Sequence, residues 1–214
     1  MSCCPPKGYA RLFGAWAARR DVKRYRSGGL DDTARLMVDF LVGRGVEDAS
    51  VLEIGGGVGA IQVELLHAGA GRATNLELSP EYEGSAADLL QEEGLDGRAE
   101  RRLGDLVRNP ELAGPADAVV MHRVVCCYPD YDALVGAAAE RARRFLVFSI
   151  PRDRRIFRAG ARASNALFRL LRWEYRTFIH PPSAVLAAAE RRGLRLAEES
   201  SGRIWQVAAL ERPV

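Results

Sequence analysis

A glycine cluster between an apolar run and a helical pattern is the feature that most constrains this chain. Residues 51–60 read VLEIGGGVGA, with glycines at positions 55, 56, 57 and 59. The apolar run is typical of a buried strand, and the following AIQVELLHAG has the spacing of a helix. Glycine is needed where the backbone turns tightly, or where a ligand leaves no room for a Cβ atom. The segment therefore predicts a strand, a ligand-sized turn and a helix.

Strand and helix patterns alternate through the first three quarters of the chain. A helix is predicted at 31–45, with Asp31 or Asp32 as its N-cap. Strands are then predicted at 49–57, 72–80, 98–106, 115–122 and 143–151, with helices between them at 60–69, 80–94 and 130–142. Such alternation indicates crossover units and a parallel sheet.

The end of the chain has a different pattern. A helix is predicted at 183–193, and two strands around Ser201-Gly202 predict a final antiparallel hairpin. We expect an α/β fold, a doubly wound and mostly parallel seven-stranded sheet with an antiparallel C-terminal hairpin strand.

Composition limits the class of protein. The chain has 214 residues, 48% of them hydrophobic and 28% charged, which is typical of one globular domain with a sizeable core. The first residues lack a secretory pattern, and no run approaches the roughly 18 apolar residues of a membrane span. We therefore expect a cytoplasmic protein with reduced cysteines.

The basic charge is concentrated in one segment. The net charge is only +3, but residues 152–176 carry eight arginines against two acids. This excess could face a nucleic acid, an anionic lipid surface or an acidic small molecule, or it could be the solvated face of a helix.

The glycine cluster alone leaves two kinds of nucleotide ligand open. Gly55, Gly57 and Ala60 also fit the dinucleotide pattern G-x-G-x-x-A, and Glu77 suits a ribose hydroxyl in either case. Three further features favour a nucleoside cofactor other than a dinucleotide. They are Glu53 before the glycines, Asp105 at the end of the third strand, and the closing hairpin.

With these features the chain resembles the class I S-adenosylmethionine-dependent methyltransferases from about residue 30 onward. VLEIGGGVG is similar to their first motif, NLELSPEY to the second, RLGDL to the third and ADAVVMHRVVCCYPD to the fourth. The length and layout are also similar to the methyltransferases of the magnesium-protoporphyrin and quinone type. The resemblance implies a Rossmann-like methyltransferase fold, with a helical cap segment at 1–30 and a single S-adenosylmethionine-binding domain at 31–214.

The resemblance also implies roles for individual residues. It places the methionine and ribose parts of the cofactor against Gly55, Gly57 and Gly59. It places the ribose at Glu77 with Leu78, and the adenine at Asp105 with Leu106. Glu53 would orient the loop or bind the cofactor amino group through water. His122, at the end of the fourth strand, is expected beside the cofactor as well.

Candidates for a catalytic base are His122, Tyr128 and His180. His122 is the best placed because it ends a strand, although a packed histidine is at least as common. Tyr128 also suits a wall residue. Asp130 suits the N-cap of the next helix.

Two segments added to the core are expected to face the acceptor. Residues 152–180 form an amphipathic helical pattern, with a break expected near Gly160, and could act as a lid. A helix on a membrane surface is an alternative use of the same pattern. The other segment is the cap segment at 1–30. The substrate-facing residues predicted from the two segments and from the fourth motif are Tyr9, Trp16, Tyr25, Arg26, Cys127, Trp173 and Tyr175.

Two pairs of adjacent cysteines remain, Cys3-Cys4 and Cys126-Cys127. Their spacing differs from the C-x₂₋₄-C of zinc sites, so we predict no metal. Small apolar packing is the main interpretation, and a metal site joining the pairs or a thiol role in catalysis is the alternative. Cys126-Cys127 stands where the family often has His-His.

The predicted function is transfer of a methyl group from S-adenosylmethionine, giving S-adenosylhomocysteine, to a small, partly apolar acceptor that can be anionic. No nucleic-acid partner is expected, and the sequence does not define the oligomeric state. A non-catalytic protein that binds either cofactor form is the alternative, followed by an NAD(P)-dependent oxidoreductase.

Overall fold

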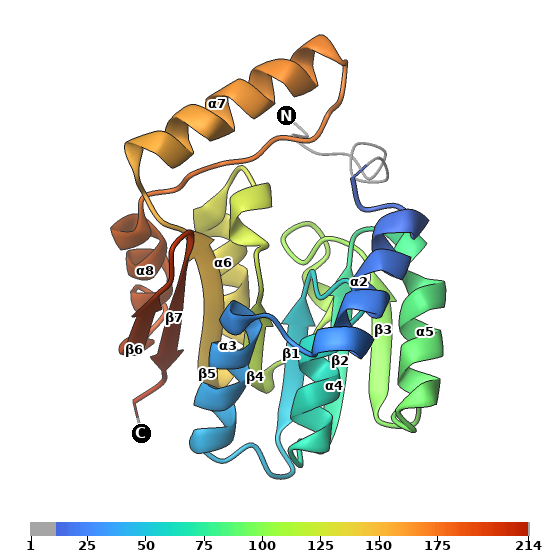
Figure 1. Ribbon diagram of the computed structural model, residues 1–214. Helices are drawn as coiled ribbons and strands as arrows, with labels where there is room; N and C mark the ends of the chain where they lie inside the picture. Colours follow the sequence, from blue (N-terminus) through green and yellow to red (C-terminus); the bar gives the residue numbers. More distant parts are fainter. Residues whose placement is uncertain (1–11, 214) are drawn as a thin grey trace.

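The fold is a seven-stranded sheet between two layers of helices (Figure 1). The computed structural model describes residues 12–213. The strand order is β3-β2-β1-β4-β5-β7-β6. The strands are β1 (Ser50–Ile54), β2 (Arg72–Glu77), β3 (Ala99–Leu103), β4 (Ala116–Met121), β5 (Ala142–Pro151), β6 (Arg195–Ser201) and β7 (Trp205–Glu211).

The predicted mixture of parallel and antiparallel pairing is confirmed. Strands β1 to β5 pair in parallel, β7 pairs antiparallel with both β5 and β6, and β6 and β7 form the predicted hairpin. The strand order reverses at β1: the chain continues from β1 to β2 and β3 on one side, and then returns to β4 on the other side. In open α/β sheets this point lies beside the ligand crevice.

The described helices follow the alternation read from the sequence. They are α2 (Ala15–Gly28), α3 (Asp32–Gly43), α4 (Ala60–His67), α5 (Glu83–Glu92), α6 (Tyr131–Arg141), α7 (Arg155–Leu170) and α8 (Pro182–Glu190). Short 3₁₀ turns lie at Pro80–Tyr82, Pro110–Leu112 and Val125–Cys127. None of the helices in residues 12–213 is long and apolar enough to cross a membrane.

Side chains alternate between the two faces of the sheet because strand geometry has a period of two. Val120 and Val147 pack in a core with α2, α3, α4 and α5. Their neighbours Val119 and Phe148 pack in a second core with α6 and α8. Both faces of the central strands are therefore buried, which is why their sequences are almost continuously apolar.

Two local predictions have clear outcomes. The side chain of Asp31 accepts hydrogen bonds from Thr33 N (3.0 Å) and Ala34 N (3.1 Å), so its role as the N-cap of α3 is confirmed. The predicted break at Gly160 is wrong, because α7 runs through it without interruption. A single glycine weakens a helix by only about 1 kcal/mol, too little to end a helix with a strong amphipathic pattern.

Candidate functional site: a cavity at the carboxyl ends of the central strands

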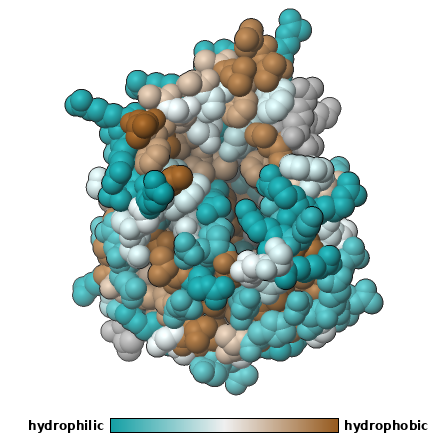
Figure 2. Space-filling model, viewed as in Figure 1, coloured by the Kyte–Doolittle hydropathy of each residue, from teal (hydrophilic) through white to brown (hydrophobic). Residues whose placement is uncertain are grey.

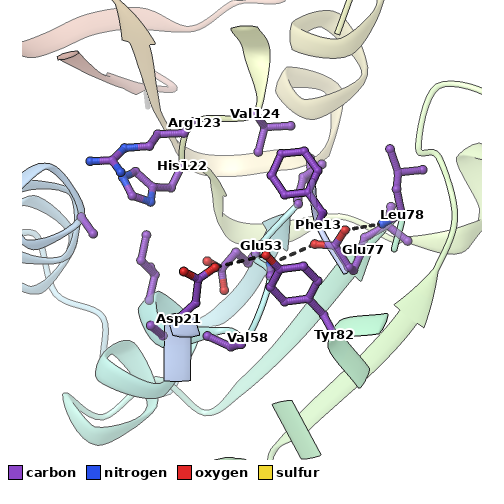
Figure 3. Close-up of a pocket in the computed structure, with 18 of the residues that line it drawn as sticks. Phe13, Asp21, Glu53, Val58, Glu77, Leu78, Tyr82, His122, Arg123 and Val124 are labelled. Carbon is purple, nitrogen blue, oxygen red and sulfur yellow. Dashed lines mark hydrogen bonds between the residues drawn. The ribbon is translucent and has the colours of Figure 1, made fainter. Parts of the chain in front are cut away.

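A cavity of about 330 Å³ lies at the carboxyl ends of β1, β2 and β4, beside the point where the strand order reverses (Figure 3). It is enclosed by segments far apart in the sequence. They are the glycine loop, the end of β2, the loops after β3 and β4, and helix α2 with the turn that follows it. The predicted cofactor residues that line it are Glu53, Gly55, Gly57, Glu77, Leu78, Asp105, Leu106 and His122. Gly59 is not among the lining residues.

The glycine loop needs its glycines for conformation and for space. Gly55 and Gly57 both have positive φ, +65° and +58°. A Cβ atom on Gly55 would lie 2.7 Å from Val124 Cγ2, and one on Gly57 would lie 3.1 Å from Tyr82 Cε1. Any larger residue at either position would strain the backbone and press into the cavity wall.

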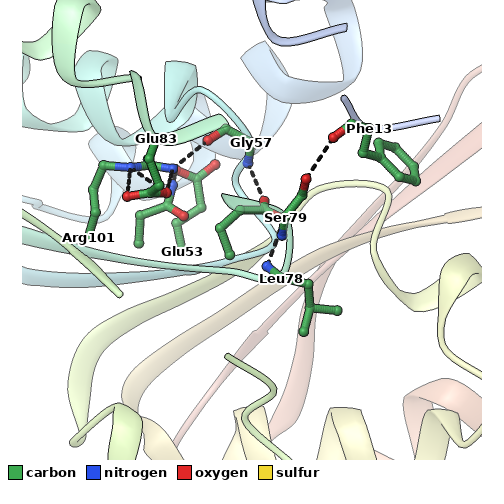
Figure 4. A network of polar contacts seen from close by, with 9 residues as sticks. Phe13, Glu53, Gly57, Leu78, Ser79, Glu83 and Arg101 are labelled. Carbon is green, nitrogen blue, oxygen red and sulfur yellow. Dashed lines mark hydrogen bonds and ion pairs between the residues drawn. The ribbon is translucent and has the colours of Figure 1, made fainter. Parts of the chain in front are cut away.

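The loop is held by a carboxylate on one side and a guanidinium on the other (Figure 4). Gly57 N donates to Glu77 Oε2 at 2.9 Å, and Arg101 Nη2 donates to Gly57 O at 2.9 Å. Arg101 is itself paired with Glu83 at 2.8 Å. The peptide units of Gly57 are thus tied to β2 and β3, and the loop is preorganised.

Glu77 also holds the turn that follows β2. Its Oε1 accepts hydrogen bonds from Leu78 N (2.8 Å) and Ser79 N (2.9 Å). Ser79 Oγ in turn donates to Phe13 O at 2.7 Å. This carboxylate therefore connects the glycine loop to the segment that enters α2.

Glu53 lies beneath the loop and is almost fully buried, with 2% of its surface exposed. Its Oε2 accepts long hydrogen bonds from Gln62 N (3.3 Å) and Asn75 Nδ2 (3.4 Å). Burial raises the pKa of Glu53 to about 8, against the lowering effects of the Gln62 N–H and of Arg101. The neutral acid therefore predominates at pH 7.

At the other end of the cavity, Asp105 and Tyr128 are linked. The Tyr128 hydroxyl donates to Asp105 Oδ1 (3.2 Å) and Oδ2 (3.1 Å), and Val107 N donates to Oδ1 at 2.9 Å. Burial and the nearby carboxylate raise the pKa of Tyr128. A tyrosine with a raised pKa is a poor base at neutral pH, so this geometry favours a wall role for Tyr128.

His122 lies in the cavity wall with two charged neighbours. Its Nε2 is 3.6 Å from Asp31 Oδ1, and Arg123 Nη2 is 3.0 Å from Asp31 Oδ2. Burial lowers the pKa of His122 to about 4, although Asp31 acts in the opposite direction. The imidazole is therefore neutral at pH 7 and holds a proton only weakly.

His180 is not part of the cavity lining. Its Nε2 lies 2.9 Å from Tyr128 O, and its ring packs between Tyr131 and Phe178. Burial lowers the pKa of His180. These contacts make it a support for the loop after β4, outside the cavity in which a base would act.

Cys127 lines the cavity and Cys126 lies buried behind it. The two sulfur atoms are 3.7 Å apart, and Cys127 Sγ is 3.1 Å from the Tyr175 hydroxyl. The Cys126 thiol and the Tyr175 hydroxyl lower the pKa of Cys127, whereas the pKa of Cys126 is raised by its contact with Cys127 and by burial.

Cys3, Cys4 and Tyr9 lie outside the described residues. Within residues 12–213, no group of three or more histidines, cysteines or acids is arranged to hold a metal ion.

The predicted substrate residues on α2 are divided between its two sides. Tyr25 lines the cavity, and its hydroxyl donates to Glu64 at 3.1 Å. Trp16 is 69% exposed, Arg26 pairs with Glu92, and neither lines the cavity. The helical period explains this, because Ala17, Ala18 and Val22 define the buried side of α2 and the two outward residues lie beyond it.

The lid expected at 152–180 does not cover the cavity. No residue of that segment lines it among the described residues. The ring of Trp173 stacks on Phe168 at 5.4 Å, and Tyr175 is buried against Cys127 and Phe13. Tyr175 thus supports the wall from behind.

Several cavity residues were not predicted from the sequence. They are Phe13, Arg20, Asp21, Arg24, Asp31, Tyr82 and Arg123 as lining residues. Asp31 was recognised only as a cap. Arg123 follows the predicted strand end directly, and its positive φ of +59° turns it toward Asp31, which no sequence pattern indicates.

No family model matches the chain. An arginine N(omega)-methyltransferase from Streptomyces achromogenes subsp. streptozoticus is 34% identical over 132 residues, covering 57% of this chain and 36% of that protein. The chain thus spans about a third of the length of this curated relative.

Solved structures match over more of the chain. Magnesium protoporphyrin IX methyltransferase from Synechocystis PCC 6803, with bound S-adenosylhomocysteine, has a TM-score of 0.73 and 20% identity, covering 92% of this chain and 94% of that one. An O-methyltransferase family protein from Burkholderia thailandensis has a TM-score of 0.65 and 22% identity, covering 84% and 56%. The fold is therefore that of S-adenosylmethionine-dependent methyltransferases, as the motifs predicted.

Glu53 generates a prediction about stability and pH. Because its pKa rises from 4.5 to about 8 on folding, its contribution to stability is complete below about pH 4.5 and is lost as pH rises through 8. A Glu53→Gln variant has no such loss. The difference in unfolding free energy between wild type and variant should therefore shift in favour of the variant by about 1 kcal/mol per pH unit between pH 5 and 8.

Urea unfolding at several pH values measures this difference. Glu198→Gln, at an exposed carboxylate of β6, is the matched control and should show a constant difference. A constant difference for Glu53→Gln as well would contradict a neutral buried acid.

The thiol pair generates a second prediction. Cys127 should react with iodoacetamide several-fold faster than Cys126 at pH 8, because it lines the cavity and has the lower pKa. Peptide mass spectrometry of a Cys3→Ser/Cys4→Ser background isolates the pair. Equal rates, or faster labelling of Cys126, would show that Cys127 does not face the cavity.

Proposed function

We propose that this protein is an enzyme that transfers the methyl group of S-adenosylmethionine to an acceptor bound in the same cavity, by in-line displacement at the sulfonium methyl. The observation that carries the proposal is the convergence of Gly55, Gly57, Glu77 and Asp105 on one cavity at the carboxyl ends of the strands. All four belong to motifs identified in the sequence. Together they match a nucleoside with a charged tail along the loop.

Glu77 has the capacity for a ribose contact. An ionised carboxylate offers about four acceptor positions, and three are used by the N–H groups of Gly57, Leu78 and Ser79. The remaining position can accept a ribose hydroxyl. Because the other three bonds already fix the carboxylate, little side-chain freedom is lost when the cofactor binds.

At the adenine end, Asp105 and Leu106 supply an acceptor and an apolar wall. Leu106 is buried, and the Tyr128 hydroxyl holds the Asp105 carboxylate in place. In this arrangement the remaining lone pairs of the Asp105 carboxylate can accept a hydrogen bond from the adenine amino group. The family resemblance implies this contact for the aspartate.

The proposed acceptor is small, partly apolar and able to carry an anionic group. Apolar contacts would come from Leu30, Val124 and Cys127, and a cation would come from Arg123. With a pKa of about 4, His122 is a weak base. An acceptor that is already nucleophilic at neutral pH, such as a carboxylate or an enolate, needs no strong base, and positioning with exclusion of water would supply most of the acceleration.

A cationic acceptor is the second candidate. The curated relative is named for methylation of arginine, and two carboxylates, Asp21 and Asp31, line the cavity here. A guanidinium must lose a proton before its nitrogen can attack, and either carboxylate could position it and receive that proton. A protein that binds the cofactor without turnover remains the non-enzymatic alternative.

Calorimetry tests cofactor binding directly. S-adenosylmethionine and S-adenosylhomocysteine should bind, and NAD should not. Glu77→Ala should weaken binding of both at least tenfold, about 1.4 kcal/mol, because the ribose contact and the loop support are lost together. Glu100→Ala, at an exposed acid of β3, is the control and should leave binding unchanged. Tight NAD binding alone would overturn the proposal, and unchanged affinity of Glu77→Ala would refute the ribose contact.

Turnover with a panel of acceptors separates the candidates. S-adenosylhomocysteine release, followed by mass spectrometry, should be stimulated by an aromatic carboxylic acid. Arg123→Gln should then raise the KM for this acid at least about tenfold, because the variant loses a charge-assisted contact that contributes roughly 1.5 kcal/mol. Arg195→Gln, exposed on β6, is the control. Stimulation by L-arginine that depends on Asp31 would instead select the cationic acceptor, and no stimulation by either class would favour a binding protein.

A further inference from the structure

Helix α7 (Arg155–Leu170) has no buried residue along its 16 positions. It lies above the carboxyl end of the sheet, apart from the two helical layers (Figure 1). The sequence of the helix, RIFRAGARASNALFRL, contains four arginines and no acid. A helix that is strongly amphipathic yet buries no side chain requires an explanation outside the core.

The apolar arc of α7 is only partly used by the protein itself. Phe157 and Phe168 are half-buried, and the Phe168 ring packs against Trp173 (5.4 Å) and Tyr175 (5.7 Å). The adjoining part of the arc points to solvent. The aliphatic side chains there are Ile156, Leu167, Leu170 and Leu171, which are 72%, 52%, 79% and 46% exposed. Figure 2 shows hydrophobic residues gathered at the end of the molecule where α7 lies.

The charges of α7 lie on the opposite side. At 100° per residue, Arg155, Arg158, Arg162 and Arg169 fall within one narrow sector, away from the exposed aliphatic side chains. Among residues 12–213, Arg158 is the member of this set that forms an ion pair, with Asp153. The arginines lie away from the apolar arc, but their long side chains can extend along the helix toward its margins.

We propose that α7 docks on the surface of an anionic lipid bilayer, with Ile156, Leu167 and Leu170 inserted at the headgroup boundary and the arginines bound to lipid phosphates. An apolar stripe and a separate row of arginines on one helix match the two parts of such an interface. A second copy of this chain matches less well, because pairing α7 with itself would bring together eight arginines without one acid from either helix. A nucleic acid would bind the arginines but leave the aliphatic stripe in water.

Docking would place the bilayer next to the candidate site. Phe168 of α7 contacts Tyr175, and the Tyr175 hydroxyl contacts Cys127 in the cavity wall. The membrane helix and the acceptor side of the cavity therefore share one packed contact. The inference is independent of the proposed activity, since it depends only on the surface of α7.

Vesicle flotation tests the proposal with the full chain. The protein should float with vesicles of phosphatidylcholine and phosphatidylglycerol at about 7:3, and at least tenfold less with phosphatidylcholine alone. Raising NaCl from about 0.1 M to 0.5 M should weaken, without abolishing, binding to the anionic vesicles, because the apolar contribution persists.

Two matched pairs of variants separate the apolar and charged contributions. Ile156→Ser/Leu170→Ser should reduce binding at least tenfold, whereas Leu103→Ser/Ile204→Ser, at exposed sites on β3 and before β7, should not. Arg155→Gln/Arg162→Gln/Arg169→Gln should reduce binding to anionic vesicles at least tenfold. Arg72→Gln/Arg143→Gln/Arg195→Gln removes the same charge from exposed sites elsewhere and should retain most of it.

Three outcomes would overturn the proposal. Equal loss in both arginine triple variants would indicate attraction by net charge alone. Self-association that is lost in Ile156→Ser/Leu170→Ser, without vesicle binding, would assign the stripe to a second copy. Binding of a single-stranded RNA oligonucleotide in place of vesicles would assign the arginines to nucleic acid. Circular dichroism of each variant confirms that the fold is retained.

Discussion

The bond from Gly57 N to the Glu77 carboxylate is the constraint on which the rest of the candidate site depends. The same carboxylate holds Leu78 N and Ser79 N, and Ser79 holds Phe13 O at the entry to α2. Three walls of the cavity are therefore set by one acidic side chain at the end of a buried strand. Its partners are backbone N–H groups, and the glycines of the loop allow the positive φ angles that this geometry requires.

Beneath this loop lies a layer of polar side chains, and burying them costs free energy. Glu53 is tolerated there because burial raises its pKa to about 8 and so keeps it uncharged at neutral pH. The layer also explains why position 56 is a glycine, because a Cβ atom there would lie 2.5 Å from Glu53 Cδ. Above the loop, His122 is likewise uncharged, while Asp31 and Arg123 remain a charge pair. Two buried titratable groups of the site, Glu53 and His122, are thus neutral, whereas Asp31 and Arg123 form a charge pair.

Short-range patterns predicted the fold well because each buried strand has to be apolar on both faces and each turn of the loop requires glycine. The placement of Glu77 and Asp105 in the cavity was predictable because both were expected at strand ends, which meet at one edge of a parallel sheet. The placement of the residues expected to face the acceptor was not. Trp16 and Arg26 lie on the outer face of α2, and within the 152–180 segment α7 is an exposed helix that does not line the cavity. The spacing of apolar residues predicts an amphipathic helix in this segment, but it does not indicate what the apolar side of that helix contacts.

By itself the sequence determined the order of the sheet elements, the glycine loop and the acids at the strand ends, because these depend on local periodicity and backbone conformation. Tertiary structure alone decided which side chains meet across the cavity. Asp31 is an N-cap in sequence terms, yet the packing of α3 against the sheet brings its carboxylate to Arg123 and His122, more than 90 positions away. The burial of Cys126 and the partial exposure of Cys127 at the cavity were decided in the same way, since the loop after β4 gives the two adjacent side chains different directions.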